Sequence, residues 1–211
     1  MRSLRILREA ASPGITKFYG AERYLLELDR TKQAYDILNL SLRFQRGPEQ
    51  IRMLGKANPE FLRRAISLAT ENVVTGRGGP FAAVIVRDGK IVGEGVNTVT
   101  ASHDPTAHGE VNAIRAATRA LGKFTLAGCE LYTSCEPCPM CLAAAYWARL
   151  DAIYFGASAA DAARAGFDDA FLYEEMRKNL GERSLPSSQL IGGEAWASFA
   201  AWLASPNKIE Y

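Results

Sequence analysis

The stretch that decides the fold is Thr133-Ser134-Cys135-Glu136-Pro137-Cys138-Pro139-Met140-Cys141. It joins an apolar strand pattern over 129–133 to a segment, 137–149, whose opening prolines are typical of a helix start. Because Cys138 and Cys141 are three residues apart, a helix directs both sulfur atoms to one side. The positive end of that helix favours thiolates, the form of cysteine that binds metal. The pair therefore predicts a metal site at the start of this helix.

The segments before and after this stretch predict an alternation of helices and strands. A helix begins at Asn58-Pro59-Glu60, a hairpin joins 81–86 to 90–96 through Arg87-Asp88-Gly89, and a second helix opens near Asp104-Pro105-Thr106 and ends at Gly122. A further apolar run, 152–155, follows the cysteine helix. A hairpin followed by this βαβ pattern predicts a mixed sheet between helices, a three-layer α/β/α sandwich.

The second helix begins with His108-Gly109-Glu110, which supplies the other half of a metal signature. One histidine and two cysteines are three protein ligands, and they leave the fourth tetrahedral position to water, as in catalytic zinc sites. We therefore expect one Zn²⁺ per chain on His108, Cys138 and Cys141, with Glu110 as a proton carrier that is not a ligand. Residues two apart on a regular helix do not face each other, so spacing alone does not bring His108 and Glu110 together.

The sequence from about residue 57 to 211 resembles the cytidine deaminase superfamily, and within it the small bacterial guanine deaminases. Beyond the metal motif, the resemblance rests on short motifs at Gly79-Pro80-Phe81, Asn97, 104–108, 133–141, 146–149, 165–169 and Glu210-Tyr211. It implies the cytidine deaminase-like fold and zinc-dependent hydrolytic deamination of a free purine base, guanine to xanthine and ammonia.

The resemblance also implies roles for five residues outside the metal motif. Asn97 corresponds to a purine-binding amide, Phe81 and Trp147 to pocket walls, and Asp169 to a second proton shuttle. Tyr211 corresponds to a C-terminal closure over the ligand. In the family, the segment that carries these last two residues is exchanged between subunits, which implies a domain-swapped homodimer.

Two features depart from the family pattern. Gly109 stands where the family usually has alanine, so its backbone N–H is expected to approach the substrate with more room and to contribute to substrate binding. The segment before Met53 has no counterpart in compact members of the family. We therefore divide the chain into an N-terminal extension over 1–56 and a deaminase domain over 57–211. Within the extension, the alternation of apolar and polar residues over 38–44 predicts a strand.

Three alternative interpretations remain open at this point. Cys135 or Cys129 could complete a structural four-ligand zinc site, which would make the chain a non-catalytic binding module. The metal motif is also shared by transfer RNA adenosine deaminases and cytosine-type deaminases. His103, which precedes Asp104-Pro105, is expected to be a solvated or capping residue rather than a ligand.

Composition limits the choice of partner. The chain has 211 residues with 48% hydrophobic and 23% charged residues, the balance of a globular domain, and no apolar run reaches the length of a membrane span. The net charge of +2 divides into 11 Lys/Arg against 6 Asp/Glu over residues 1–56 and 14 against 17 beyond them. A nucleic-acid partner is therefore not expected. All four cysteines lie between Cys129 and Cys141, which favours a metal site in a reducing, cytoplasmic setting over disulfides.

Overall fold

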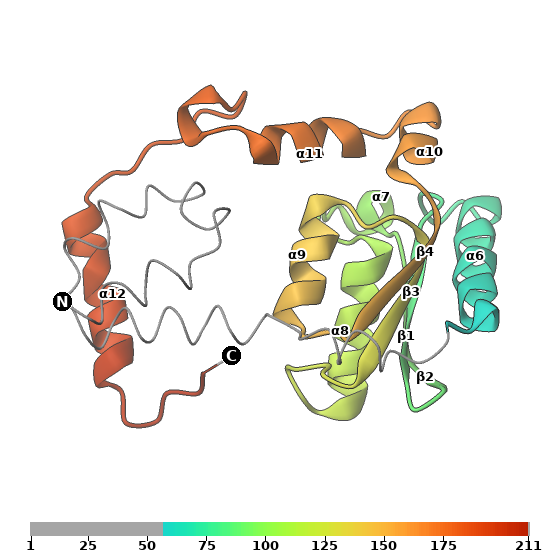
Figure 1. The fold of residues 1–211 in the computed structure, drawn as a ribbon, viewed down its shortest axis with the longest axis horizontal. Helices are drawn as coiled ribbons and strands as arrows, with labels where there is room; N and C mark the ends of the chain where they lie inside the picture. The colour runs from blue at the N-terminus through green and yellow to red at the C-terminus, as the bar shows by residue number, and fades with distance from the viewer. Residues whose placement is uncertain (1–56, 211) are drawn as a thin grey trace, which may run out of the picture. The chain divides into compact units, whose positions relative to one another are not determined.

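The structure is a computed structural model that describes residues 57–210, and at its centre lies one four-stranded sheet (Figure 1). The predicted strand at 38–44 lies outside the described residues. The strands are β1 (Ala82–Arg87), β2 (Lys90–Val96), β3 (Cys129–Cys135) and β4 (Ala152–Ala157), in the spatial order β2-β1-β3-β4. β1 is antiparallel to β2 and β3, whereas β3 and β4 are parallel. The predicted mixed sheet is confirmed.

Helices cover both faces of the sheet. α6 (Pro59–Val74) covers one face, and α8 (Gly109–Leu121) and α9 (Pro139–Trp147) cover the other (Figure 1). The alternation of side chains along β1 divides the core accordingly: Ala83 and Ile85 pack with α8 residues, while Val84 and Val86 pack with α6 residues. The three-layer sandwich is therefore confirmed, with a separate apolar core on each face.

The β1–β2 hairpin turns at the residues that the sequence indicated. Asp88 and Gly89 both have positive φ, 50° and 70°, which suits the tight turn of a two-residue hairpin. On β2, a Cβ at Gly95 would lie 2.2 Å from the backbone nitrogen of Ala113, and a Cβ at Gly93 would lie 2.6 Å from that of Ala117. Glycine at these two positions therefore lets α8 pack directly on the hairpin.

The helix that was expected to open near Asp104 begins later, at Gly109. Asp104 Oδ1 accepts hydrogen bonds from the Thr106 backbone N–H at 2.8 Å and from its hydroxyl at 2.6 Å, so this segment forms a turn rather than a helix start. A short helix, α7 (Val99–Ser102), precedes it and was not predicted.

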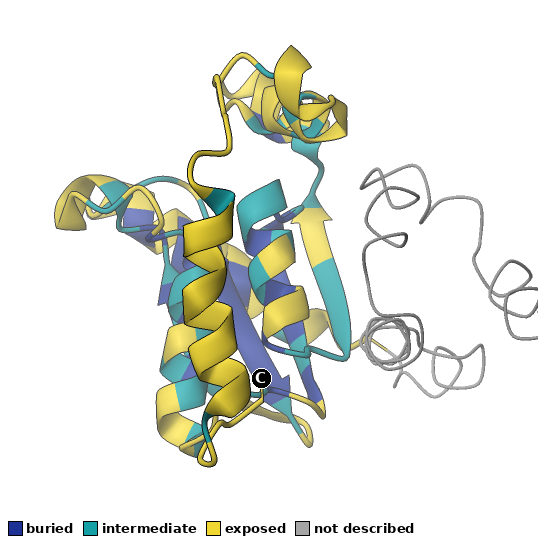
Figure 2. Ribbon diagram, turned by 90° about the vertical axis from the view of Figure 1, so that its left-hand side faces the viewer, coloured by how far each residue is buried: buried dark blue, intermediate teal, exposed yellow. Residues whose placement is uncertain are grey.

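Past the last strand, the chain continues through α10 (Ala159–Arg164), α11 (Asp169–Arg177), the 3₁₀ turn η1 (Leu180–Glu182) and α12 (Gly192–Ala204). Beyond Ala162, none of the described residues is buried (Figure 2). Large apolar side chains are exposed on α11 and α12, among them Phe171, Met176, Trp196, Phe199 and Leu203. Over residues 57–210, no helix combines the length and the apolar character that crossing a membrane requires.

Candidate active site

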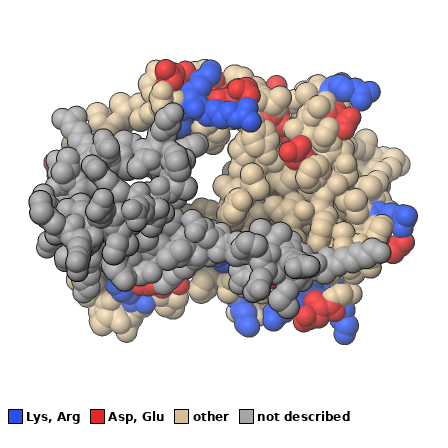
Figure 3. Space-filling model, viewed as in Figure 1, with Lys and Arg blue, Asp and Glu red and all other residues tan. Residues whose placement is uncertain are grey.

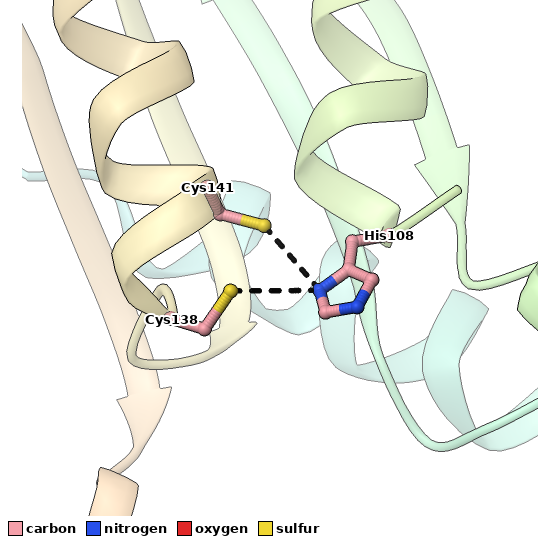
Figure 4. Close-up of side chains that lie close together, drawn as sticks. All are labelled: His108, Cys138 and Cys141. Carbon is pink, nitrogen blue, oxygen red and sulfur yellow. Dashed lines mark hydrogen bonds between the residues drawn. The ribbon is translucent and has the colours of Figure 1, made fainter. Parts of the chain in front are cut away.

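Three donor side chains converge where α8 and α9 begin. His108 and Cys138 are the residues just before these helices, and both have extended backbones, with ψ of 157° and 167°. His108 Nδ1 lies 3.6 Å from the Cys138 sulfur and 3.5 Å from the Cys141 sulfur (Figure 4). One donor atom from each of the three residues lies within 4.8 Å of the others. This donor set and spacing fit a tetrahedral zinc ion with three protein ligands.

The charges of the site favour the thiolate that a metal requires. Hydrogen bonds from the Cys141 thiol and from His108 lower the pKa of Cys138 to about 4. The hydrogen bond with Cys138 also raises the pKa of His108. The hydrogen bond between Cys141 and Cys138, together with burial, raises the pKa of Cys141. Metal binding to such a group releases the protons that the three side chains share.

Glu110 lies against the same cluster and is only 5% exposed. Its Oε2 lies 3.4 Å from the Cys141 sulfur, and its Oε1 accepts a hydrogen bond from the Thr133 hydroxyl at 3.1 Å. Burial raises the pKa of the Glu110 carboxyl. The helical spacing rule does not apply to His108, because its extended backbone lies outside the helix. His108 and Glu110 can therefore face one site although they are two residues apart.

A cavity of about 250 Å³ opens onto this cluster. Its wall includes three residues to which the family resemblance gave roles: Phe81, Asn97 and Asp169. Phe81 packs edge-to-face on Phe167, with ring centroids 4.6 Å apart, so two aromatic rings form one side. Burial raises the pKa of the Asp169 carboxyl, and the neighbouring Cys138 acts in the same direction. The cavity thus combines a metal site, two carboxyl groups and an aromatic wall.

Two of the residues that were expected to contact substrate do not line this cavity. Trp147 is at the C-terminal end of α9, 62% exposed and outside the cavity, with the Arg149 guanidinium carbon 5.8 Å from its ring centre. Gly109 is also absent from the cavity wall; a Cβ there would lie 2.8 Å from Ala82 Cα. Glycine at 109 therefore permits close packing of α8 on β1, and the contact of its backbone N–H with substrate stays a prediction. Tyr211 lies outside the described residues.

The other cysteines and His103 take no part in the metal cluster. The Cys135 thiol points to the Ser158 carbonyl, 3.6 Å away, and burial raises its pKa to about 11. Cys129 is buried beneath α8 in the apolar core. His103 has left-handed backbone at the end of α7 and is exposed. Among the described residues, only His108, Cys138 and Cys141 form a group of metal donors, which argues against a four-ligand structural site.

Several cavity residues were given no role by the sequence analysis. They are Gly79, Val99, Thr100, Glu136 and Phe167. Val99 and Thr100 belong to α7, whose single turn leaves no periodic signal. Glu136 lies in the motif 133–141 and Phe167 in the motif 165–169. Their closeness in sequence to the metal cysteines and to Asp169 is the signal that could have indicated their place in the cavity wall.

Comparison with known proteins agrees with this geometry. Residues 56–157 match the family described as "Cytidine and deoxycytidylate deaminase zinc-binding region". The guanine deaminase of Bacillus subtilis is 56% identical over 151 residues, which are 72% of this chain and 97% of that protein. The X-ray structure of a Bacillus subtilis guanine deaminase covers 74% of this chain and 99% of its own, with a TM-score of 0.71 and 54% identity. A transfer RNA-specific adenosine deaminase of Agrobacterium fabrum is 44% identical over 78 residues, 37% of this chain and 51% of that protein.

The chain belongs to the cytidine and deoxycytidylate deaminase family and is a zinc-dependent deaminase, a hydrolase. His108, Cys138 and Cys141 form the group of side chains that could hold its zinc ion. Within the family, its similarity extends over nearly the full length of the Bacillus subtilis guanine deaminase, but over only about half of the Agrobacterium adenosine deaminase.

Proposed function

We propose that this protein deaminates guanine hydrolytically, giving xanthine and ammonia. The observation that carries the proposal is one cavity lined by two of the metal donors, by the paired rings of Phe81 and Phe167, and by three polar side chains, Glu110, Asn97 and Asp169. The cavity volume of about 250 Å³ is below the range of pockets that bind drug-sized ligands, which favours a free base as the substrate. Figure 3 shows positive and negative side chains interspersed on the visible described surface, rather than a basic face for RNA.

In this reaction a C–O bond forms at the amino-bearing ring carbon and the C–N bond to the amino group breaks. Zinc supplies Lewis-acid chemistry that makes a water molecule nucleophilic near neutral pH. Glu110 accepts the proton of that water and delivers it to the ring nitrogen. Asp169 takes the second water-derived proton from the hydroxyl on that carbon as the C=O bond forms and delivers it to the departing amine, which leaves as ammonia. Asn97 hydrogen-bonds the base, and Phe81 packs on its ring.

The deciding experiment is ammonia release from guanine, cytosine and an adenosine-containing RNA, each with and without a chelator. We expect release from guanine only and its loss in chelator. Glu110→Gln should keep its zinc and its fold while turnover falls about 10²- to 10⁴-fold, the usual contribution of a general acid or base. Release from RNA in preference to guanine, or a Gln variant as fast as the wild type, would overturn the assignment.

We divide the chain into an extension over 1–56 and a deaminase domain over 57–211, and we propose that catalysis does not need residues 1–52. The proposal is supported by the positions of the metal donors and the cavity residues, since Gly79 is the first of them in the sequence. A chain that begins at Met53 should deaminate guanine with the kcat and KM of the full chain. An insoluble product, or a KM raised several-fold, would make the extension an integral part of the domain.

The active form is proposed to be a homodimer in which the C-terminal segment crosses to the partner and brings Asp169 and Tyr211. Exposed apolar side chains on α12, including Trp196 and Phe199, support an apolar interface. Within this single chain, Asp169 lines its own cavity. In a domain-swapped dimer, the same contact between Asp169 and the cavity would form between two chains instead of within one. A mixing experiment therefore has to distinguish a segment that crosses to the partner from one that folds onto its own chain.

Complementation tests the exchange. Glu110→Ala and Asp169→Ala chains, each inactive, are unfolded and refolded together. If the segment crosses, one site of each heterodimer receives both wild-type residues, and random pairing restores roughly a quarter of the sites. If each segment folds onto its own chain, mixing restores no activity. Deletion of Tyr211 should raise the KM for guanine in either arrangement, which checks its role as a closure.

A cytoplasmic location is proposed from the state of the cysteines. All four are free and buried, with no disulfide. Thiols that serve as metal ligands are kept in this state by reducing compartments. Fractionation of cells that express the protein should recover it, with its zinc, in the cytoplasmic fraction.

A further inference from the structure

The proposed mechanism leaves one buried polar side chain on β3 without a role. Thr133 has no exposed surface and sits in the central part of the sheet, opposite Ala83 of β1. It follows Cys129 and Leu131 on the same face of the strand, and both of those residues belong to the core beneath α8. Valine would fill such a position without a polar group to satisfy, so the hydroxyl calls for a specific partner.

That partner is the Glu110 carboxylate. The Thr133 hydroxyl lies 3.1 Å from Glu110 Oε1 and 3.4 Å from the Ala82 carbonyl oxygen. A hydroxyl carries one proton, and the shorter contact to the stronger acceptor receives it. Thr133 therefore donates to Glu110 from the sheet, whereas the metal cysteines lie at the start of helix α9.

Zinc binding makes this hydrogen bond more important. Cys141 contacts Glu110 Oε2 as a thiol donor at 3.4 Å, but as a zinc ligand it is a thiolate and has no proton to give. Thr133 is then the side-chain hydrogen-bond donor that the described residues still offer to Glu110. It holds Oε1, which leaves Oε2 on the metal side of the carboxylate.

We propose that Thr133 is a positioning residue for catalysis: it fixes one oxygen of Glu110 so that the other moves the proton between water and base. The inference rests on the proposed role of Glu110. It does not give Thr133 any contact with substrate or metal. A side chain of this kind should affect kcat, because it sets the geometry of proton transfer, and should leave the binding of guanine nearly unchanged.

The test compares Thr133→Val and Thr133→Ser with the matched control Tyr132→Phe. Tyr132 is the residue before Thr133 on β3, is 2% exposed, and donates its hydroxyl proton to Glu130 Oε2 at 2.9 Å on the opposite face of the sheet. The control therefore removes the hydroxyl of another buried side chain from the same strand, one whose hydrogen bond is partly buried. For each variant, kcat and KM for guanine, zinc content and Tm are measured.

Thr133→Val should lower kcat about 10- to 100-fold, the usual effect of losing a residue that orients an active-site group. KM and zinc content should stay near the wild-type values, and Thr133→Ser, which keeps the hydroxyl, should recover most of the rate. Tyr132→Phe should lower Tm without changing kcat. A Val variant as fast as the wild type, or a Ser variant as slow as Val, would overturn the inference.

The Tm values provide a second readout that is independent of turnover. If Thr133 and Glu110 share a hydrogen bond, the Tm decreases of Thr133→Val and Glu110→Ala should be non-additive in the double variant. Additive decreases would refute the bond itself. A wild-type protein that releases no ammonia from guanine would refute the proposed function, and this coupling would still decide whether Thr133 holds Glu110.

Discussion

Asn72 provides the sharpest test of how the cavity wall is held. It lies on α6, is fully buried, and is not one of the three metal donors. Its Nδ2 donates to the Gly79 carbonyl at 2.9 Å and to the Asn97 carbonyl at 2.8 Å. Gly79 and Asn97 both line the cavity, so one side-chain amide ties two separate parts of the wall to the helix behind them. The informative change is Asn72→Leu, which keeps the branched outline of the side chain and removes both donors.

The magnitude follows from the two acceptors that the change leaves behind. The Asn97 carbonyl is in a buried hydrogen bond and the Gly79 carbonyl in a partly buried one, and each buried group that loses its partner costs about 1–3 kcal/mol. The buried Oδ1 of Asn72 has no hydrogen-bond partner, so its removal returns part of that cost. We expect a net loss of roughly 2–3 kcal/mol, or about 4–12 °C in Tm for a chain of this size.

The assay is thermal unfolding together with kinetics on guanine. Because Asn97 and Gly79 are released while the metal site is untouched, KM should rise several-fold and zinc content should not change. Glu71→Gln is the control: this neighbouring residue on α6 only makes an exposed ion pair with Arg77, which contributes little. An Asn72→Leu protein that keeps both the wild-type Tm and the wild-type KM would refute this account of the wall.

Three further predictions concern the metal, the α8 contact and the C-terminal segment. Cys141→Ser should lose its zinc in a metal analysis while Cys135→Ser keeps it, and the reverse pattern would contradict the ligand assignment. Gly109→Ala should lower stability by about 1–3 kcal/mol, because its Cβ would lie 2.8 Å from a backbone atom of β1; an unchanged Tm would show that α8 can move without cost. The Glu175 carboxylate accepts hydrogen bonds from Lys178 and Ser184, which lower its pKa from 4.5 to about 2. The stabilising effect of the Glu175 carboxylate is therefore fully present above pH 4.5 and is lost as the pH falls towards 2. The Tm difference between the wild type and Glu175→Gln should be constant above pH 4.5 and should shrink as the pH falls from 4.5 towards 2. A difference that stays undiminished at pH 2 would contradict the assignment.

Local signals were sufficient for most of the fold. Asn58 caps α6 as expected, with its Oδ1 accepting from the Glu60 N–H at 3.0 Å, because a capping residue followed by proline acts within one turn of chain. The hairpin turn at Asp88-Gly89 is likewise a property of adjacent residues. The start of α8 was placed too early, because the Asp104 side chain can bond either to a helix start or to a turn, and sequence alone does not distinguish the two.

The site was predictable in its metal ligands and less so in its walls. His108, Cys138 and Cys141 carry their chemistry in residue type and spacing, so they could be named in advance. The packing of Gly109 on Ala82 and the bond from Thr133 to Glu110 depend on how a helix and two strands meet. Such contacts join residues distant in the chain and leave no periodic trace. Trp147 is exposed at the C-terminal end of α9, whereas the metal cysteines lie at the N-terminal end of the same helix.

The glycines of β2 also guard against misfolding of the hairpin. Gly93 and Gly95 face α8, while Glu94 between them forms a two-pronged ion pair with Arg64 of α6, both distances being 2.8 Å. A slip of one residue would turn every β2 side chain to the opposite face. A carboxylate would then lie beneath α8, where not even a methyl group fits, and Arg64 would face a glycine. A hairpin with the wrong register would therefore be destabilised on both faces of the sheet. Such a hairpin should not persist once α6 and α8 pack on it.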